Sequence, residues 1–400
     1  MWNVPSLSLT SPFTSITGLA GGLLTAGTQA FGKAWDWAGG LPGAVLAMPL
    51  SFVNSGRTIP PAAPSDTGHF VEVRPPGLAP MTVAYERRGT GEPVVLLHGI
   101  GSNRQAWDAV MPLLTVEREV ITVDLPGFGD SPDLPDGLPH DLPTVVASLG
   151  AVFSALGLKR PHVVGHSMGG LIALRLGQAG LARSVTAVAP AGFWSHAERW
   201  YALTVLNAAR QIARLPEPVT AWLSQTILGH AVLTGTLYMR ADRSTPEAVV
   251  ASLRALRQAA GFQATVRAGR ARDLFVGDIP DLPVTLAWGT ADRVLPARQA
   301  ARAAAMIPMA RMMWLPRCGH VPMNDAPQLV AQIILRATAR SSTAELPESG
   351  RGCALAPAST GSPLSSVSAV PYTVGNDRPH GGRGARGTWV TVQDETRGQE

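Results

Sequence analysis

Three side chains that together could carry out nucleophilic catalysis follow predicted strands in the order serine, aspartate, histidine. Ser167 comes directly after an apolar strand, Asp292 follows the apolar strand 284–289, and His320 follows a short strand within residues 310–320. A serine hydroxyl attacks at neutral pH only when a base takes its proton. The imidazole that serves as the base needs a carboxylate to hold its tautomer. These residue types predict Ser167 as nucleophile, His320 as base and Asp292 as the acid that orients it.

Glycines around Ser167 predict a sharp turn from a strand into a helix. Residues 165–170 read Gly-His-Ser-Met-Gly-Gly, and Gly165 and Gly169 leave room where a β-carbon would clash. Taken alone, the run could also be a glycine-rich turn that carries an incidental serine. Parallel strands of one sheet deliver the residues that follow them to its carboxyl edge. The three side chains are therefore expected to meet there.

Five short motifs make the chain resemble the α/β-hydrolase superfamily over residues 69–338. They are Gly-His-Ser-Met-Gly-Gly at 165–170, His-Gly-Ile-Gly at 98–101, Asp-Leu-Pro-Gly-Phe-Gly-Asp-Ser at 124–131, Trp-Gly-Thr-Ala-Asp at 288–292 and Cys-Gly-His-Val-Pro at 318–322. The resemblance implies an α/β fold with an eight-stranded, mostly parallel sheet, helices on both faces and a helical cap after strand 6. It also implies the triad Ser167–Asp292–His320 and an oxyanion hole from the backbone N–H groups of Ile100 and Met168.

The long stretch between the strands at 184–190 and 284–289 exceeds a simple crossover. Helical patterns at 194–215, 218–233 and 246–260, with prolines near their starts, predict an inserted helical layer. In the family that the chain resembles, such an insertion forms a lid over the nucleophile. Trp194, Trp200 and Trp222 are candidate substrate-binding residues in an apolar pocket beneath it. The alternative for each is that it only packs the lid against the core.

Residues near the nucleophile favour one reaction among several that the superfamily supports. His166 before Ser167 resembles esterases and lipases, whereas carbon–carbon bond hydrolases usually carry Asn there. The chain is therefore predicted to cleave carboxylic esters, with short- to medium-chain or monoacylglycerol-like substrates, through an acyl-enzyme on Ser167. The alternatives are a carbon–carbon bond hydrolase or an acyltransferase that uses the same triad. A third is a non-catalytic ligand receptor on a hydrolase fold.

Composition, together with the resemblance to the α/β-hydrolase superfamily, divides the chain into five segments. We expect an apolar, Gly/Ala-rich N-terminal extension at 1–57, a linker at 58–68 and a disordered tail at 341–400. The hydrolase core is expected in two pieces, 69–192 and 280–340, with a helical lid at 193–279 between them. The extension matches neither a secretory signal nor a membrane span. It predicts either a peripheral membrane contact or a flexible or core-packing extension.

Charge and cysteine content restrict the partners. The net charge of +5 comes from arginines that are scattered rather than clustered, so no nucleic-acid partner is expected. No phosphate loop or metal-spaced cluster is evident, and neither a metal nor a cofactor is expected. Cys318 is interpreted as a small buried residue beside His320. The expected partner is a small apolar ester, and the expected location is the cytoplasm, with membrane association through residues 1–57 as the alternative.

Other polar residues near the motifs are expected to be structural. His98 ends a buried strand and is predicted to hydrogen-bond backbone, and His166 is predicted to point to the opposite side of the strand, into the core. Asp124 and Asp130 flank a Gly-Phe-Gly turn and are predicted to cap it. A carboxylate from that turn remains a minor alternative to Asp292.

Overall fold

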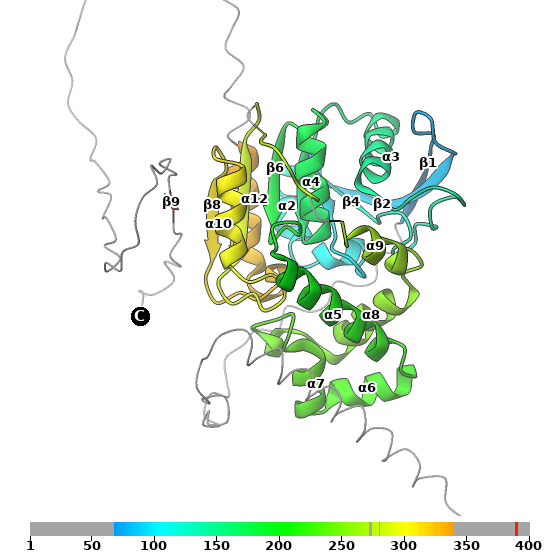
Figure 1. The fold of residues 1–400 in the computed structure, drawn as a ribbon, viewed down its shortest axis with the longest axis vertical. Coiled ribbons are helices and arrows are strands. Elements are labelled where there is room, and N and C mark those ends of the chain that lie inside the picture. Colours follow the sequence, from blue (N-terminus) through cyan, green and yellow to red (C-terminus); the bar gives the residue numbers. More distant parts are fainter. Residues whose placement is uncertain (1–67, 272–273, 280, 340–388, 391–400) are drawn as a thin grey trace, which may run out of the picture. The chain divides into compact units, whose positions relative to one another are not determined.

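The computed structural model describes residues 68–271, 274–279, 281–339 and 389–390 (Figure 1). The predicted extension, linker and tail lie outside these residues, apart from Gly68 and residues 389–390. The membrane contact through residues 1–57 and the cytoplasmic location therefore stay predictions. Within the described part, no helix has both the length and the apolar composition that crossing a bilayer requires.

The described core is built on one mixed sheet whose strand order is β1-β2-β4-β3-β5-β6-β7-β8-β9. The pairs β1–β2 and β2–β4 at one edge are antiparallel, and all the other pairs are parallel. The predicted sheet of eight mostly parallel strands is confirmed, and a two-residue β9 pairs with β8. The strands are β1 (His69–Val73), β2 (Met81–Arg88), β3 (Glu92–Leu97), β4 (Arg118–Val123), β5 (His162–His166), β6 (Ser184–Val188), β7 (Val284–Gly289), β8 (Arg311–Leu315) and β9 (Trp389–Val390).

The central strands are apolar because both faces of the sheet are covered. Every residue of β5, β6 and β7 is buried, as expected for parallel strands between two helical layers. Alternate residues of β3 enter different clusters: Val95 and Leu97 join one, Val94 and Leu96 the other. This alternation follows from the two-residue period of a strand.

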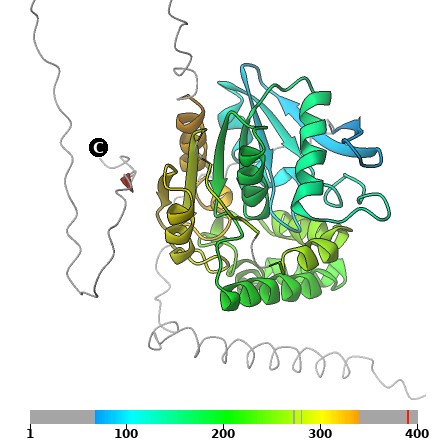
Figure 2. The same cartoon turned by 45° about the horizontal axis from the view of Figure 1, so that its top comes forward.

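Helices cover both faces of the sheet (Figures 1 and 2). Their apolar side chains complete each cluster. On one face lie α3 (Leu142–Ala155), α4 (Met168–Gln178) and α10 (Arg298–Met306), and on the other lie η1 (Arg104–Trp107), α2 (Met111–Leu114) and α12 (Pro327–Ala339). The α3 helix begins where the Asp141 carboxylate accepts a hydrogen bond from the Thr144 N–H, an N-cap that satisfies a free donor of the first turn. The short α11 (Pro322–Asp325) follows the histidine loop.

The insertion between β6 and β7 is helical, as the sequence predicts. It contains α5 (His196–Ala213), α6 (Glu217–Gln225), α7 (Ile227–Thr234), η2 (Ala241–Arg243), α8 (Pro246–Gln258) and α9 (Phe262–Ala268). The helical stretch predicted at 218–233 is two helices, because the backbone of Thr226 is extended and its hydroxyl caps α7 through the Gly229 N–H. A threonine can interrupt a helix in this way because its side chain competes for backbone donors.

Candidate active site

Ser167 lies in a tight turn between β5 and α4, where the backbone is strained. It has φ 54° and ψ −114°, a region that costs a non-glycine residue about 1–3 kcal/mol. A β-carbon on Gly165 would overlap the Gly169 carbonyl, and one on Gly169 would overlap the Leu97 carbonyl. Both glycines are therefore required for the close approach of α4 to the sheet, which holds the serine in this conformation.

The three predicted side chains form one hydrogen-bonded chain at the carboxyl ends of β5, β7 and β8. His320 Nε2 lies 3.1 Å from Ser167 Oγ, and His320 Nδ1 lies 2.8 Å from Asp292 Oδ2. All three residues are buried, and Ser167 is 8% exposed. Asp292 Oδ1 accepts the backbone N–H groups of Val294 and Leu295, which leaves Oδ2 directed at the imidazole. Such a chain can move a proton from the hydroxyl to the imidazole.

The loop after β3 lies against Ser167. A β-carbon on Gly99 would sit 3.2 Å from Ser167 Cβ, so residues 98–101 and the serine are neighbours. As predicted, His98 bonds backbone: Nδ1–H donates to the Gly99 carbonyl at 2.8 Å, and Nε2 accepts the Leu125 N–H at 3.0 Å. Burial lowers the pKa of His98, so the ring stays neutral and pins this loop to the end of β4.

Comparison with known proteins shows the family of this chain. Residues 94–333 match the model of the Alpha/beta hydrolase family. The chain belongs to this family. The predictions of an α/β-hydrolase fold and of a hydrolytic enzyme are thereby confirmed.

Individual relatives include esterases and an acyltransferase component. The chain is 30% identical over 250 residues to the dihydrolipoyllysine-residue acetyltransferase component of an acetoin cleaving system from Pseudomonas putida. That match covers 61% of this chain and 63% of the relative, which is less than two thirds of its length. A pimeloyl-[acyl-carrier protein] methyl ester esterase of Aeromonas hydrophila is 29% identical, covering 64% of this chain and 98% of the relative. The structure of a thermophilic esterase from Thermogutta terrifontis superposes with a TM-score of 0.56 at 23% identity, covering 69% and 100%.

His166 of this alpha/beta hydrolase differs from its prediction. It is buried as expected, but it lies against the histidine loop and not on the opposite side. Its Nε2–H donates to the backbone carbonyl of His320 at 2.7 Å, and the two imidazole rings are 4.9 Å apart. Burial, and to a smaller extent the neighbouring His320, lowers the pKa of His166 to about 3. His166 is therefore a neutral donor that fixes the backbone of His320.

Asp325 is a second supporting residue, and it lies outside the motifs that the sequence analysis identified. It is 1% exposed, and its carboxylate accepts the N–H groups of Gly319 at 2.7 Å, Met239 at 3.1 Å and Arg240 at 2.8 Å. The N–H of His320 donates to the Leu237 carbonyl at 2.9 Å. The histidine loop and the segment 237–240 of the insertion are thus held together by main-chain hydrogen bonds.

Asp124 caps the turn after β4, as the sequence predicts, whereas the Asp130 carboxylate pairs with the Arg104 side chain. Asp124 Oδ2 accepts the Asp130 N–H at 2.9 Å, and Asp124 Oδ1 accepts the Arg104 N–H at 2.6 Å. Arg104 also forms ion pairs with both aspartates. These carboxylates are therefore committed to the turn, and Asp292 is the acid that faces His320. Cys318 is buried as predicted, and burial raises the pKa of its thiol to about 12.

The three tryptophans predicted to line a pocket lie in different surroundings. Trp194 is half-buried and packs against the larger core cluster. Trp200 and Trp222 are 62% and 63% exposed, more than side chains enclosed in a pocket would be. Their role in substrate binding stays a prediction.

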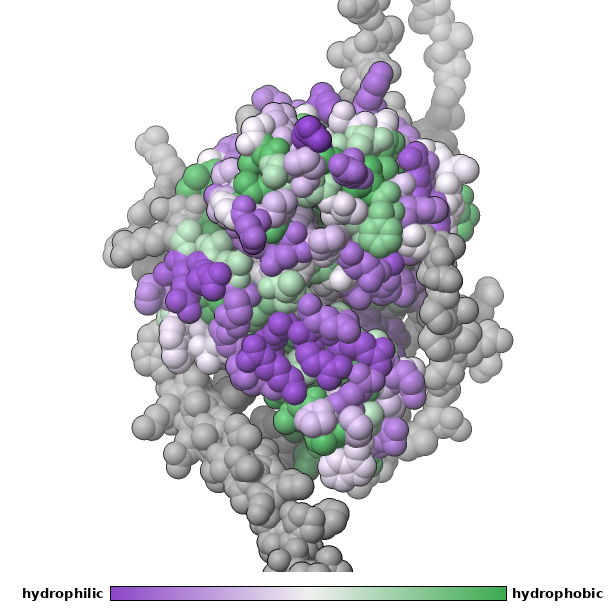
Figure 3. Space-filling view, turned by 90° about the vertical axis from the view of Figure 1, so that its right-hand side faces the viewer, coloured by the Kyte–Doolittle hydropathy of each residue, from purple (hydrophilic) through white to green (hydrophobic). Residues whose placement is uncertain are grey.

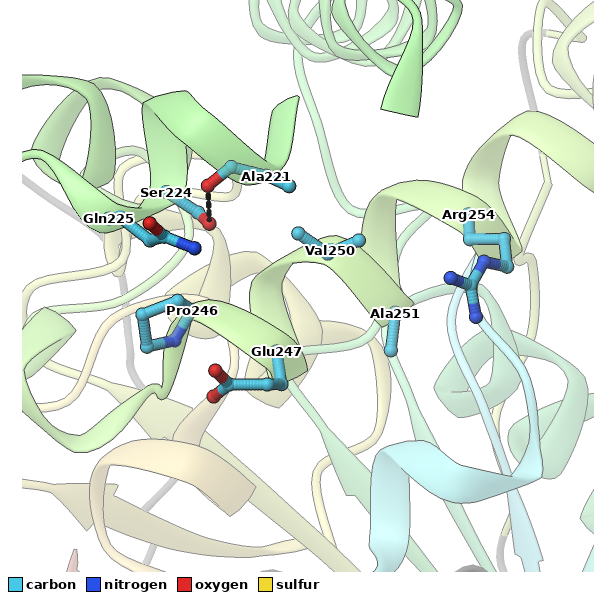
Figure 4. A pocket seen from close by; sticks show the side chains of 8 residues that line it. All are labelled: Ala221, Ser224, Gln225, Pro246, Glu247, Val250, Ala251 and Arg254. Atoms are coloured by element: carbon cyan, nitrogen blue, oxygen red, sulfur yellow. Dashed lines mark hydrogen bonds between the residues drawn. The ribbon is translucent and has the colours of Figure 1, made fainter. Parts of the chain in front are cut away.

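A separate groove of about 280 Å³ lies between α6 and α8 (Figure 4). Its lining comes only from those two helices, and none of Ser167, Asp292 and His320 takes part. The residues that line it are Ala221, Ser224, Gln225, Pro246, Glu247, Val250, Ala251 and Arg254. Among the described residues, no group of three or more His, Cys, Asp or Glu side chains is arranged to hold a metal ion.

Proposed function

We propose that this alpha/beta hydrolase cleaves carboxylic esters through an acyl-enzyme on Ser167. The observation that carries the proposal is the buried hydrogen-bonded chain from Asp292 through His320 to the Ser167 hydroxyl. A serine with a histidine base oriented by a carboxylate is the arrangement of acyl-transfer catalysis. The similarity to a methyl ester esterase supports the choice of an ester as substrate.

In the first half-reaction, Ser167 Oγ attacks the carbonyl carbon of the ester while its proton passes to His320 Nε2. Asp292 holds Nδ1–H and stabilises the imidazolium that forms. Collapse of the tetrahedral intermediate breaks the bond to the alcohol oxygen, which leaves with the proton from Nε2. In the second half-reaction, His320 takes a proton from water, the hydroxide attacks the acyl-enzyme, and Ser167 regains its proton as the acid departs.

Two backbone N–H groups are proposed to stabilise the oxyanion. Met168 is the first residue of α4, where N–H groups lack partners within the helix. Ile100 belongs to the loop whose Gly99 lies against Ser167. Donors on two rigid elements beside the nucleophile stabilise the negative charge as it develops on the carbonyl oxygen. Removal of one such donor typically lowers kcat by about 10²–10³.

Positioning of His320 is assigned to His166 and Asp325. His166 donates to the His320 carbonyl, and Asp325 accepts the N–H of Gly319, the residue before it. Both side chains contact the backbone of the histidine loop, whereas the hydrogen bond to the serine hydroxyl comes from His320, so each acts through the loop. A shift of about 1 Å in a catalytic group can lower a rate by about 10², which makes these contacts important for the reaction.

The insertion is proposed to act as a lid that makes the site apolar. A β-carbon on Gly101, which has φ +73°, would overlap Leu256 of α8 and lie 3.6 Å from Phe262 of α9. Apolar side chains of the insertion therefore lie directly on the proposed oxyanion loop. An apolar cover excludes water and suits the acyl chain of a short- to medium-chain or monoacylglycerol-like ester.

Covalent labelling with a fluorophosphonate tests the proposal at Ser167. The native chain should be labelled at Ser167, and both Ser167→Ala and His320→Ala should not be, because only an oxygen with an adjacent base attacks phosphorus rapidly. Heat-unfolded native protein is the control for nonspecific labelling. Equal labelling of native and Ser167→Ala chains would contradict the assignment of the nucleophile.

A further inference from the structure

The helices α6 and α7 of the insertion expose large apolar side chains. The exposed positions are 218, 219, 222 and the polar Gln225 on α6, and 227, 228, 231 and 232 on α7. Their spacing places them on one face of each helix. Ile227 is 93% exposed, Leu228 76%, Trp222 63% and Val232 56%. Two adjacent helices therefore present apolar faces to the outside.

The opposite, buried face of α6 carries hydroxyl groups. Thr220 and Ser224 are almost completely buried. Each hydroxyl bonds a carbonyl of its own helix: Thr220 donates to Glu217 and Ser224 to Ala221. A helix on a water-facing surface normally buries its apolar residues and exposes its polar ones. The reverse arrangement on α6 indicates that its outward face meets an apolar environment.

Charge on the insertion is distributed around this face and not on it. Residues 218–239 contain no Asp, Glu, Lys or Arg, and the exposed Arg214 and Arg240 lie on either side of that stretch. The whole insertion, residues 193–279, holds ten arginines and six acidic residues. Its net charge is therefore +4, compared with +5 for the whole chain. Figure 3 shows apolar surface at the lower end of the molecule, below a band of hydrophilic residues.

We propose that the outward face of α6 and α7 docks on an anionic lipid surface. An uncharged apolar face bordered by arginines complements a bilayer whose headgroups are negative and whose interior is apolar. Trp222 suits that boundary, because an indole combines an apolar ring with a polar N–H. A second protein copy fits less well, since a stable interface uses about 20–30 residues from each side and this face offers eight exposed positions.

The segment that follows the docking face in sequence contacts the proposed active site. The segment after α7 supplies Leu237 and Met239, whose backbone groups bond the loop of His320 and the Asp325 carboxylate. A lipid surface on this side would bring apolar esters next to the insertion that covers Ser167. Delivery of such a substrate rests on the proposed function, whereas the docking itself does not.

Vesicle binding of the full chain tests the docking without any catalysis. In a Ser167→Ala background, we compare vesicles of phosphatidylcholine with vesicles that also contain phosphatidylglycerol. Ile227→Ser with Leu228→Ser removes the two most exposed side chains of the face. Val116→Ser with Met309→Ser is the matched control, because these side chains are 82% and 78% exposed on the core. Thermal melts establish that both pairs of variants are folded.

We expect the parent chain to bind vesicles, and to bind more tightly when they contain phosphatidylglycerol. The double substitution at 227 and 228 should weaken binding at least about tenfold, and the control double substitution should leave it unchanged. Absence of binding by the parent would overturn the proposal, and so would equal binding by the two pairs. A concentration-dependent dimer that only the pair at 227 and 228 abolishes, with no vesicle binding, would assign the face to a second copy. If the chain with Ser167 intact binds vesicles but hydrolyses no ester, the docking proposal stands and the proposed function is contradicted.

Discussion

Protonation of His166 should make the folded protein less stable as pH falls. Its ring is buried, it donates Nε2–H to the His320 carbonyl, and its pKa falls from 6.5 to about 3 in the folded chain because of burial. In the unfolded chain the ordinary value returns. Below about pH 6.5 the unfolded state therefore binds a proton that the folded state does not, and the free energy of unfolding decreases towards about pH 3.

The size of this effect follows from the shift. Each pH unit between the two pKa values changes the free energy of unfolding by about 1.36 kcal/mol per proton, so going from about pH 8 to about pH 5 removes about 2 kcal/mol. A His166→Gln variant keeps an N–H donor but has no proton to bind. It should lack this part of the pH dependence.

Urea unfolding of the native chain and of His166→Gln, measured at several pH values, gives the comparison directly. Burial also lowers the pKa values of His98 and His162, so both proteins should lose stability in acid. The difference between their slopes isolates His166. Identical slopes would refute the reasoning, because they would mean that the His166 ring titrates equally in the folded and unfolded states.

Three further predictions test the contacts around the site. Asp292→Asn should lower kcat for an ester by about 10³–10⁴, because an amide no longer fixes the tautomer of His320; near-native steady-state rates would contradict this. Asp325→Asn should lower the free energy of unfolding in urea by about 1–3 kcal/mol, because three backbone donors lose a carboxylate, and the exposed control Asp136→Asn should not; equal losses would be inconsistent with the assigned contacts. Cys318 should resist iodoacetamide in the folded chain because burial raises the pKa of its thiol to about 12. Mass spectrometry of the peptide that contains Cys318 measures the extent of alkylation, and equal alkylation of the folded and unfolded chains would disprove the prediction.

The sheet and the meeting of Ser167, Asp292 and His320 at its edge could be predicted because they depend on local patterns. Strands buried on both faces appear as continuous apolar runs, so β5 and β7 were recognisable from composition alone. Ser167, Asp292 and His320 each follow such a strand, and a parallel sheet brings its carboxyl ends together whatever the sequence separation. Gly165 and Gly169, which a sharp turn requires, indicated the position of Ser167 between them.

The supporting contacts could not be predicted because they depend on how loops pack. His166 meets the carbonyl of His320 across 154 positions of sequence, and a strand pattern does not say which loop covers a side chain. Asp325 binds two N–H groups of the insertion across 86 and 85 positions, and no motif contains it. The exposure of Trp200 and Trp222 could not be predicted for the same reason. Helical periodicity identifies the apolar face of a helix but not which part of the protein, if any, packs against it.

The central claim is that Ser167 performs ester hydrolysis. Its most direct test is the turnover of a series of p-nitrophenyl esters from acetate to palmitate by the native chain and by Ser167→Ala. We expect native turnover with an optimum at short to medium acyl chains, and a loss of at least about 10³-fold in the variant. Undiminished turnover by a folded Ser167→Ala chain, or none by the folded native chain with any ester, would contradict the account.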